Sequence, residues 1–135
     1  MKMHEVLEDG YIYCGDLIDP VTQERYGLAI APEDIEKPMK WDDIDHRNVM
    51  TKLEGLYLYE TSAKFFNKDE RYWVVAEEGN NNAWFERFSD GSQSYFSKNY
   101  LSWVRPIRRI TYPKPKKSPI LRELKAIRKL IEEKL

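Results

Sequence analysis

The sequence predicts an α+β domain followed by a separate C-terminal amphipathic helix. Through residues 1–110, short runs of aromatic and β-branched residues recur between turn signals, which is typical of strands. Residues 120–135 instead carry apolar residues at helical spacing. Residues 111–119 lie between these two parts and hold three prolines and three lysines, which indicates an extended linker. A chain of 135 residues suits one such domain.

The first half of the domain predicts two strands and two short helices. Residues 11–15 and 25–31 have strand composition and are separated by a turn-rich stretch with Asp-Pro. Residues 41–47 suit a short helix with acidic residues in its first turn. A second helix is expected from Thr51, because Glu54 follows at the spacing of a capping box.

The second half predicts a run of antiparallel strands. The Ser-Asp-Gly sequence at 89–91 is a hairpin turn signal, and the Asn-rich stretch at 79–82 suits a turn with left-handed backbone. The final strand contains Pro106, which indicates a sheet edge or a strand end. The expected strands are 71–77, 83–88, 93–97 and 101–107.

Several motifs in this half resemble those of the Lcl C-terminal-domain-like family, which consists of C-type-lectin-like modules of bacterial and phage proteins. The motifs are Tyr72-Trp73, Ala83-Trp84, Phe88-Ser89-Asp90-Gly91 and Val104-Arg105-Pro106-Ile107-Arg108. Weaker matches upstream are Asp9-Gly10 with Tyr13 and Gly15, Ala31-Pro32 with Met39–Asp43, and Thr51–Glu54 with Leu56–Glu60. The resemblance implies a C-type-lectin-like fold, with two short helices packed on small antiparallel sheets. Arg47–Met50 replaces the family's usual Trp-Arg-Leu-Pro run, so a trimmed variant is expected.

Enzymatic chemistry is not expected. The single cysteine, Cys14, excludes an internal disulfide, a cysteine zinc cluster and a CxxC pair, and is expected to be a buried hydrophobe. Formylglycine-generating enzymes share the lectin-like fold and depend on active-site cysteines, and a single cysteine cannot reproduce that chemistry. His46 lies among aspartates as if on a solvated helix. The sequence has no phosphate-binding loop and no dinucleotide fingerprint, so we expect no cofactor.

Calcium-dependent sugar binding is an alternative that the lectin-like fold brings with it. Glu77, Glu78 and Asn80–Asn82 gather oxygen ligands of the kind that calcium prefers. The Glu-Pro-Asn and Trp-Asn-Asp signatures of such sites are missing, and asparagine runs favour turns for local reasons. We therefore expect a turn here and no metal site.

Charge is distributed unevenly along the chain. Residues 1–60 carry 14 acidic and six basic residues, whereas residues 61–135 carry nine acidic and 16 basic ones. Residues 91–122 contain eight bases and no acid. This block is interpreted first as a solvated edge that complements the acidic half. The alternative is nucleic-acid binding through residues 98–122, where Tyr100, Trp103 and Tyr112 lie among the bases as a stacking platform requires.

The tail is the most informative feature for function. Ser118 is placed to cap the helix and Pro119 suits its first position. A helix of sixteen residues is marginally stable in isolation, so the apolar stripe of this helix is expected to pack against another surface. Docking on the domain, self-association and insertion into a partner's groove all remain open. The stripe is formed by Ile120, Leu124, Ile127 and Ile131.

These observations predict a non-catalytic protein-binding module. Through its phage relatives, the resemblance implies a small phage- or prophage-encoded protein that binds and modulates, or inhibits, a host protein, or assembles as an accessory particle component. The alternatives are nucleic-acid binding and inherited glycan binding. The N-terminus has no signal-peptide pattern and no stretch suits a membrane span, so we expect a soluble protein of the cytoplasm, the host's if phage-encoded. The expected contacts, to a host protein or to another copy in a homo-oligomer, are Ile120, Leu124, Ile127, Ile131, Arg105, Arg108, Arg109, Lys114, Lys116 and Lys117.

Overall fold

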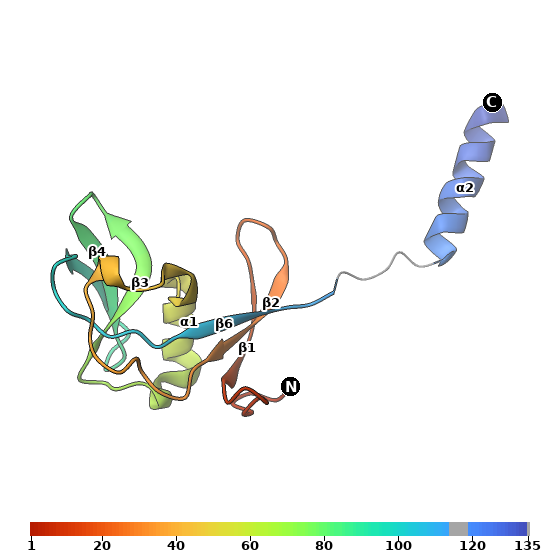
Figure 1. Ribbon diagram of the computed structural model, residues 1–135. Coiled ribbons are helices and arrows are strands. Elements are labelled where there is room, and N and C mark those ends of the chain that lie inside the picture. The colour runs from red at the N-terminus through yellow and green to blue at the C-terminus, as the bar shows by residue number, and fades with distance from the viewer. Residues whose placement is uncertain (114–118, 135) are drawn as a thin grey trace.

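The computed structural model describes residues 1–113 and 119–134, and of residues 119–122 it describes the backbone alone. These parts contain two three-stranded antiparallel sheets and two α-helices, α1 at Lys52–Ser62 and α2 at Pro119–Lys134 (Figure 1). The expected α+β class is thereby confirmed. Helix α1 lies between the sheets and contacts strand β1 (Ile12–Ile18) of one sheet and strand β3 (Arg71–Glu78) of the other.

The first sheet joins the two ends of the domain. It has the order β1-β2-β6, with β1 at Ile12–Ile18, β2 at Arg25–Ile30 and β6 at Ile107–Thr111. The β1–β2 turn is closed by Asp19, whose carboxylate accepts hydrogen bonds from the next backbone N–H groups. A bulge in β1 places Gly15 at φ +104°, a conformation that glycine adopts most readily.

The second sheet is a meander of consecutive strands. It has the order β3-β4-β5, with β3 at Arg71–Glu78, β4 at Asn82–Arg87 and β5 at Gln93–Ser97. The β4–β5 turn contains Gly91 at φ +75°, and the Asp90 carboxylate accepts a hydrogen bond from the Ser92 backbone N–H at 2.9 Å. The hairpin that the Ser-Asp-Gly signal predicts is therefore present.

Helix α1 runs over Lys52–Ser62 and begins with the predicted capping box. Thr51 Oγ1 accepts from the Glu54 N–H at 3.1 Å, and Glu54 Oε1 accepts from the Thr51 N–H at 2.8 Å. The expected helix at 41–47 is instead two 3-10 turns, Trp41–Asp43 and His46–Asn48; a third follows α1 at Ala63–Phe65.

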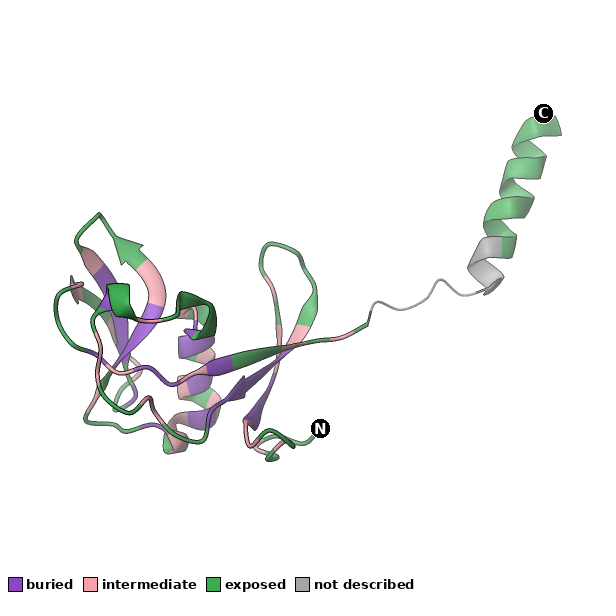
Figure 2. Ribbon diagram, viewed as in Figure 1, coloured by how far each residue is buried: buried purple, intermediate pink, exposed green. Residues whose placement is uncertain are grey.

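Two clusters of buried side chains form the core (Figure 2). One lies between the first sheet, α1 and β3, and includes Cys14, Leu28, Leu58 and Phe88. The other surrounds Trp73, which no solvent reaches. Trp84 and Trp103 are half-buried at the edge of the first cluster.

The last predicted strand, at 101–107, is wrong. Residues 101–106 are irregular, and Ser102 and Trp103 form isolated bridges to Met39 and Tyr72. The strand begins at Ile107, directly after Pro106, which has no N–H to donate to a sheet. It continues through Thr111, and Tyr112 OH donates to Asp16 Oδ1 at 2.7 Å. Ordered contacts therefore extend into the segment predicted to be linker; the rest of that segment, residues 114–118, lies outside the described residues.

A buried carboxylate, Glu54, ties α1 to the first sheet. Glu54 is 1% exposed, and Arg109 of β6 donates to both its oxygens, Nη2 to Oε1 at 2.7 Å and Nε to Oε2 at 2.8 Å. Tyr26 OH of β2 donates to Oε2 at 2.8 Å. Burial alone would raise the pKa of Glu54, but the bonds from Arg109 and the Thr51 N–H outweigh it and lower that pKa.

A second buried carboxylate, Glu86 of β4, lies beneath α1 without a cation. Its Oε1 accepts from Gln93 Nε2 at 2.8 Å, and its Oε2 has no hydrogen-bond partner. A Cβ at Gly55 of α1 would lie 2.9 Å from Oε1, so this helical glycine makes room for the carboxyl group. Burial raises the pKa of Glu86 to about 7.

Replacing Glu54 by Gln should lower the free energy of unfolding by about 2–3 kcal/mol, because hydrogen bonds to charged groups are the strong ones. Urea unfolding of the purified protein measures this difference. Glu60→Gln, an exposed substitution on the same helix, is the matched control and should change stability by less than about 0.5 kcal/mol. Equal losses in the two variants would contradict the role given to Glu54.

Replacing Glu86 by Gln should remove a pH dependence of stability. The pKa of Glu86 is raised in the folded protein from 4.5 to about 7, so the folded state keeps a proton that the unfolded chain releases. Stability therefore falls as pH rises through this window and stays lower above it. Between about pH 5 and about pH 8 the unmodified protein should lose about 2–3 kcal/mol more than Glu86→Gln. Urea unfolding at both pH values measures this, and parallel losses would refute the buried-carboxyl assignment.

Candidate functional site

Helix α2 spans Pro119–Lys134 and carries an apolar stripe that the described residues leave uncovered (Figure 2). Leu124, Ile127 and Ile131 recur at helical spacing and are 53–56% exposed, and Leu130 beside them is 56% exposed. The helix starts at the expected proline, one residue before the predicted boundary. The side chain of Ile120 and the predicted cap Ser118 lie outside the described residues.

The other face of α2 is charged. Lys125 and Lys129 lie opposite the stripe by helical periodicity, and Arg128 Nε lies 3.2 Å from Glu132 Oε1 one turn on. The helix therefore has two chemically distinct sides. A helix of this kind gains stability mainly by burying its apolar side on another surface.

A largely apolar groove of about 1090 Å3 opens on the domain where the chain reaches Pro113. Val21 of the β1–β2 turn is 89% exposed, and Leu53 at the start of α1 is 50% exposed. Sequence reasoning missed this groove. The available signal was Val21, an apolar residue within a turn, where polar residues are usual. The groove is lined by Val21, Tyr26, Leu53, Val75, Tyr112 and Pro113, among others.

The three predicted arginines lie in different environments. Arg105 is 5% exposed, and its Nε donates to Asp34 Oδ1 at 2.8 Å. Arg109 is bound to Glu54 as described above. Arg108 is exposed and pairs with Asp9 at 2.8 Å. Of the three, only Arg108 is free to meet a partner without breaking a buried contact. Lys114, Lys116 and Lys117 lie outside the described residues.

The aromatic residues of the basic segment are also engaged within the domain. Trp103 Nε1 donates to Glu70 Oε2 at 2.8 Å, and Tyr112 OH donates to Asp16. The Arg25 guanidinium covers the Tyr112 ring at 4.9 Å from its centroid. Tyr100 remains exposed. These contacts leave no continuous row of free rings among the described bases.

The remaining chemical candidates are all held in structural contacts. Cys14 is fully buried, as expected, and burial raises the pKa of its thiol. His46 stacks on Trp41 and its Nε2 donates to the Trp41 carbonyl at 2.8 Å. The β3–β4 turn is held by Lys98, which directly follows β5. Its Nζ donates to the Asn80 carbonyl at 3.0 Å and lies 3.3 Å from Glu77 Oε2. Within residues 1–113 and 119–134, no group of three or more His, Cys, Asp or Glu side chains is arranged to hold a metal ion.

Comparison with known proteins does not assign this chain to a family. No protein-family model matches this sequence, and no curated protein matches it either. In the described part of the chain, neither helix combines the length and apolar composition that a bilayer span requires.

Proposed function

We propose that this chain is a non-catalytic protein-binding module whose contact element is α2. The observation that supports this proposal is the uncovered stripe of Leu124, Ile127 and Ile131, each more than half exposed. The domain at residues 1–113 has two buried clusters of its own. The apolar side of α2 is therefore available to a surface on another polypeptide.

The size of the stripe is adequate for a specific contact. Burying one large aliphatic side chain stabilises an association by about 1.5–3 kcal/mol before the entropy of association is deducted. Four such side chains on one helix face match the usual pattern of a helix bound in an apolar groove. The charged opposite face of the bound helix remains exposed to solvent.

The finer parts of the proposal rest on the motif resemblance. We take residues 1–110 to be a trimmed C-type-lectin-like module, and the chain to be phage- or prophage-encoded. In that setting it binds and modulates a host protein in the host cytoplasm, or joins a particle as an accessory component. Nucleic-acid binding is ranked lower, since Arg105 and Arg109 of the basic segment are held by carboxylates inside the domain. Glycan binding is ranked lower because only an analogy of fold suggests it.

The proposal is tested by paired serine substitutions in the full chain. Ile127→Ser with Ile131→Ser should abolish association, because it removes half of the apolar stripe. Lys125→Ser with Lys129→Ser places the same residues at the same spacing on the charged face and should leave association intact. Sedimentation velocity measures self-association, and affinity capture from nuclease-treated cell lysate, read by mass spectrometry, detects a stoichiometric partner.

The proposal is supported by an oligomer or a captured protein that the isoleucine variant loses and the lysine variant keeps. It is refuted if the unmodified chain is monomeric at every concentration and captures nothing. Equal behaviour of the two variants also refutes it, since the stripe would then have no special role.

A further inference from the structure

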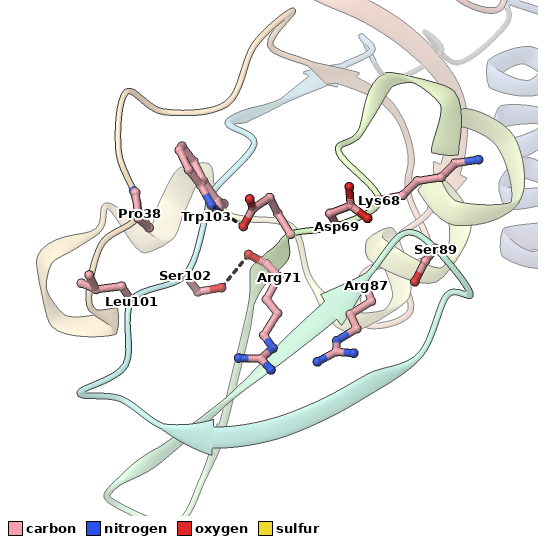
Figure 3. Close-up of a pocket in the computed structure, with 10 residues that line it drawn as sticks. Pro38, Lys68, Asp69, Arg71, Arg87, Ser89, Leu101, Ser102 and Trp103 are labelled. Atoms are coloured by element: carbon pink, nitrogen blue, oxygen red, sulfur yellow. Dashed lines mark hydrogen bonds between the residues drawn. The ribbon is translucent and has the colours of Figure 1, made fainter.

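Two arginines face each other across the second sheet. Arg71 opens β3 and Arg87 closes β4, and the two residues are direct partners in the antiparallel register. Partners in such a register project from the same face of a sheet, with Cβ atoms roughly 5 Å apart. In Figure 3 the two side chains leave the sheet side by side and in the same direction.

The backbone of both residues is held by hydrogen bonds. The Arg71 carbonyl accepts from Ser102 Oγ at 2.7 Å and from the Trp103 N–H at 2.8 Å. The Arg87 carbonyl accepts from the Gly91 N–H at 2.9 Å. The guanidinium carbons of Arg71 and Arg87 lie 5.5 and 5.9 Å from the centre of the Phe85 ring. Both cations are therefore positioned over one aromatic residue.

Among the arginines whose side chains are described, Arg71 and Arg87 differ from the others in forming no ion pair with a carboxylate. Six of the eight arginines with described side chains form an ion pair, and Arg71 and Arg87 are the remaining two. The nearby Asp90 carboxylate accepts from the Ser92 N–H and forms no ion pair with Arg87 among the described contacts. Like charges directly opposite each other destabilise a sheet, so an anion placed between them would be bound favourably.

The arginine pair lines a pocket of about 440 Å3. Its apolar lining residues are Pro38, Leu101 and Trp103, which together are called the apolar wall. Asp69 and Glu70 also line the pocket, and Glu70 accepts from Trp103 Nε1. Lys68 is a third cation in the lining, so three cations lie there with two carboxylates. A site with this small positive balance and an apolar wall favours a singly charged anion with an aliphatic neighbour over a phosphate dianion.

We propose that this pocket binds a carboxylate of an acidic segment on a partner polypeptide, with Arg71 and Arg87 as the paired donors. An adjacent aliphatic side chain of that segment lies against the wall formed by Leu101 and Trp103. This inference rests on the proposed function only in taking the anion from a protein. It does not depend on α2, so the two proposals can fail separately.

The test is a titration of the full chain, followed by NMR of the arginine Nε–Hε groups at low ionic strength. The probe is the capped tripeptide acetyl-Asp-Leu-Glu-amide, and acetyl-Asn-Leu-Gln-amide is its neutral control. The acidic peptide should shift the Arg71 and Arg87 signals, and its affinity should fall by about tenfold or more in a combined Arg71→Gln and Arg87→Gln variant. Arg47→Gln, which removes an exposed arginine elsewhere, should change the affinity by less than about twofold.

Three results would overturn the assignment. The first is an equal loss of affinity in Arg47→Gln, which would mean that overall charge alone attracts the peptide. The second is equal binding of the neutral peptide. The third is tighter binding of inorganic phosphate than of the acidic peptide at the same two arginines, which would make the site one for phosphate groups. A melting curve of each variant confirms that the fold is kept. Arg71→Lys, which keeps a cation at this position, should retain part of the affinity that the combined glutamine variant loses.

Discussion

The pairing of Glu54 with Arg109 is the contact on which the arrangement of the domain depends most. The Glu54 carboxylate caps α1, receives the guanidinium of the last strand and accepts from Tyr26 of the middle strand. Arg109 also donates to the carbonyls of Arg47 and Val49, at 3.2 and 3.3 Å. Because an ionised carboxylate is costly to bury unless it is paired and hydrogen-bonded, these bonds restrict how α1, β2 and β6 can be placed relative to one another.

This placement has consequences for the surface. Strand β6 is held against α1, and the chain therefore leaves the domain at the edge of the groove lined by Leu53 and Tyr112. The irregular segment at 101–106 then crosses from the second sheet to the first. Its Trp103 N–H donates to the Arg71 carbonyl, and the Trp73 N–H donates back to the Trp103 carbonyl. The same crossing brings the apolar wall of the small pocket beside the arginine pair.

The two candidate contact regions use different physical forces. The α2 stripe offers area, which gives affinity with little dependence on salt. The arginine pair offers two oriented donors, which give orientation and selectivity for an acidic partner. The basic second half and the acidic first half of the chain meet within the domain, where Arg105, Arg108 and Arg109 pair with Asp34, Asp9 and Glu54. A partner with an apolar groove and a neighbouring carboxylate would satisfy both regions.

The sequence by itself determined the features that depend on neighbours along the chain. The Thr51–Glu54 capping box, the turn at Asp90-Gly91, the α2 helix beginning at Pro119 and the α+β class were all predicted correctly. Each is decided by hydrogen bonds or backbone preferences within a few residues. The five earlier strands were found for the same reason, with ends displaced by three residues at most and residues 93–97 matched without any displacement.

Only the tertiary structure decided which residues meet across the fold. It moved the last strand to Ile107–Thr111, buried Arg105 against Asp34, and paired Arg109 with the buried Glu54. It left Glu86 without a cation. It also set Arg71 opposite Arg87, a pairing that a shift of register by one residue would destroy. Such contacts join residues far apart in sequence, and their energies come from burial and from the partner opposite, neither of which a local pattern contains.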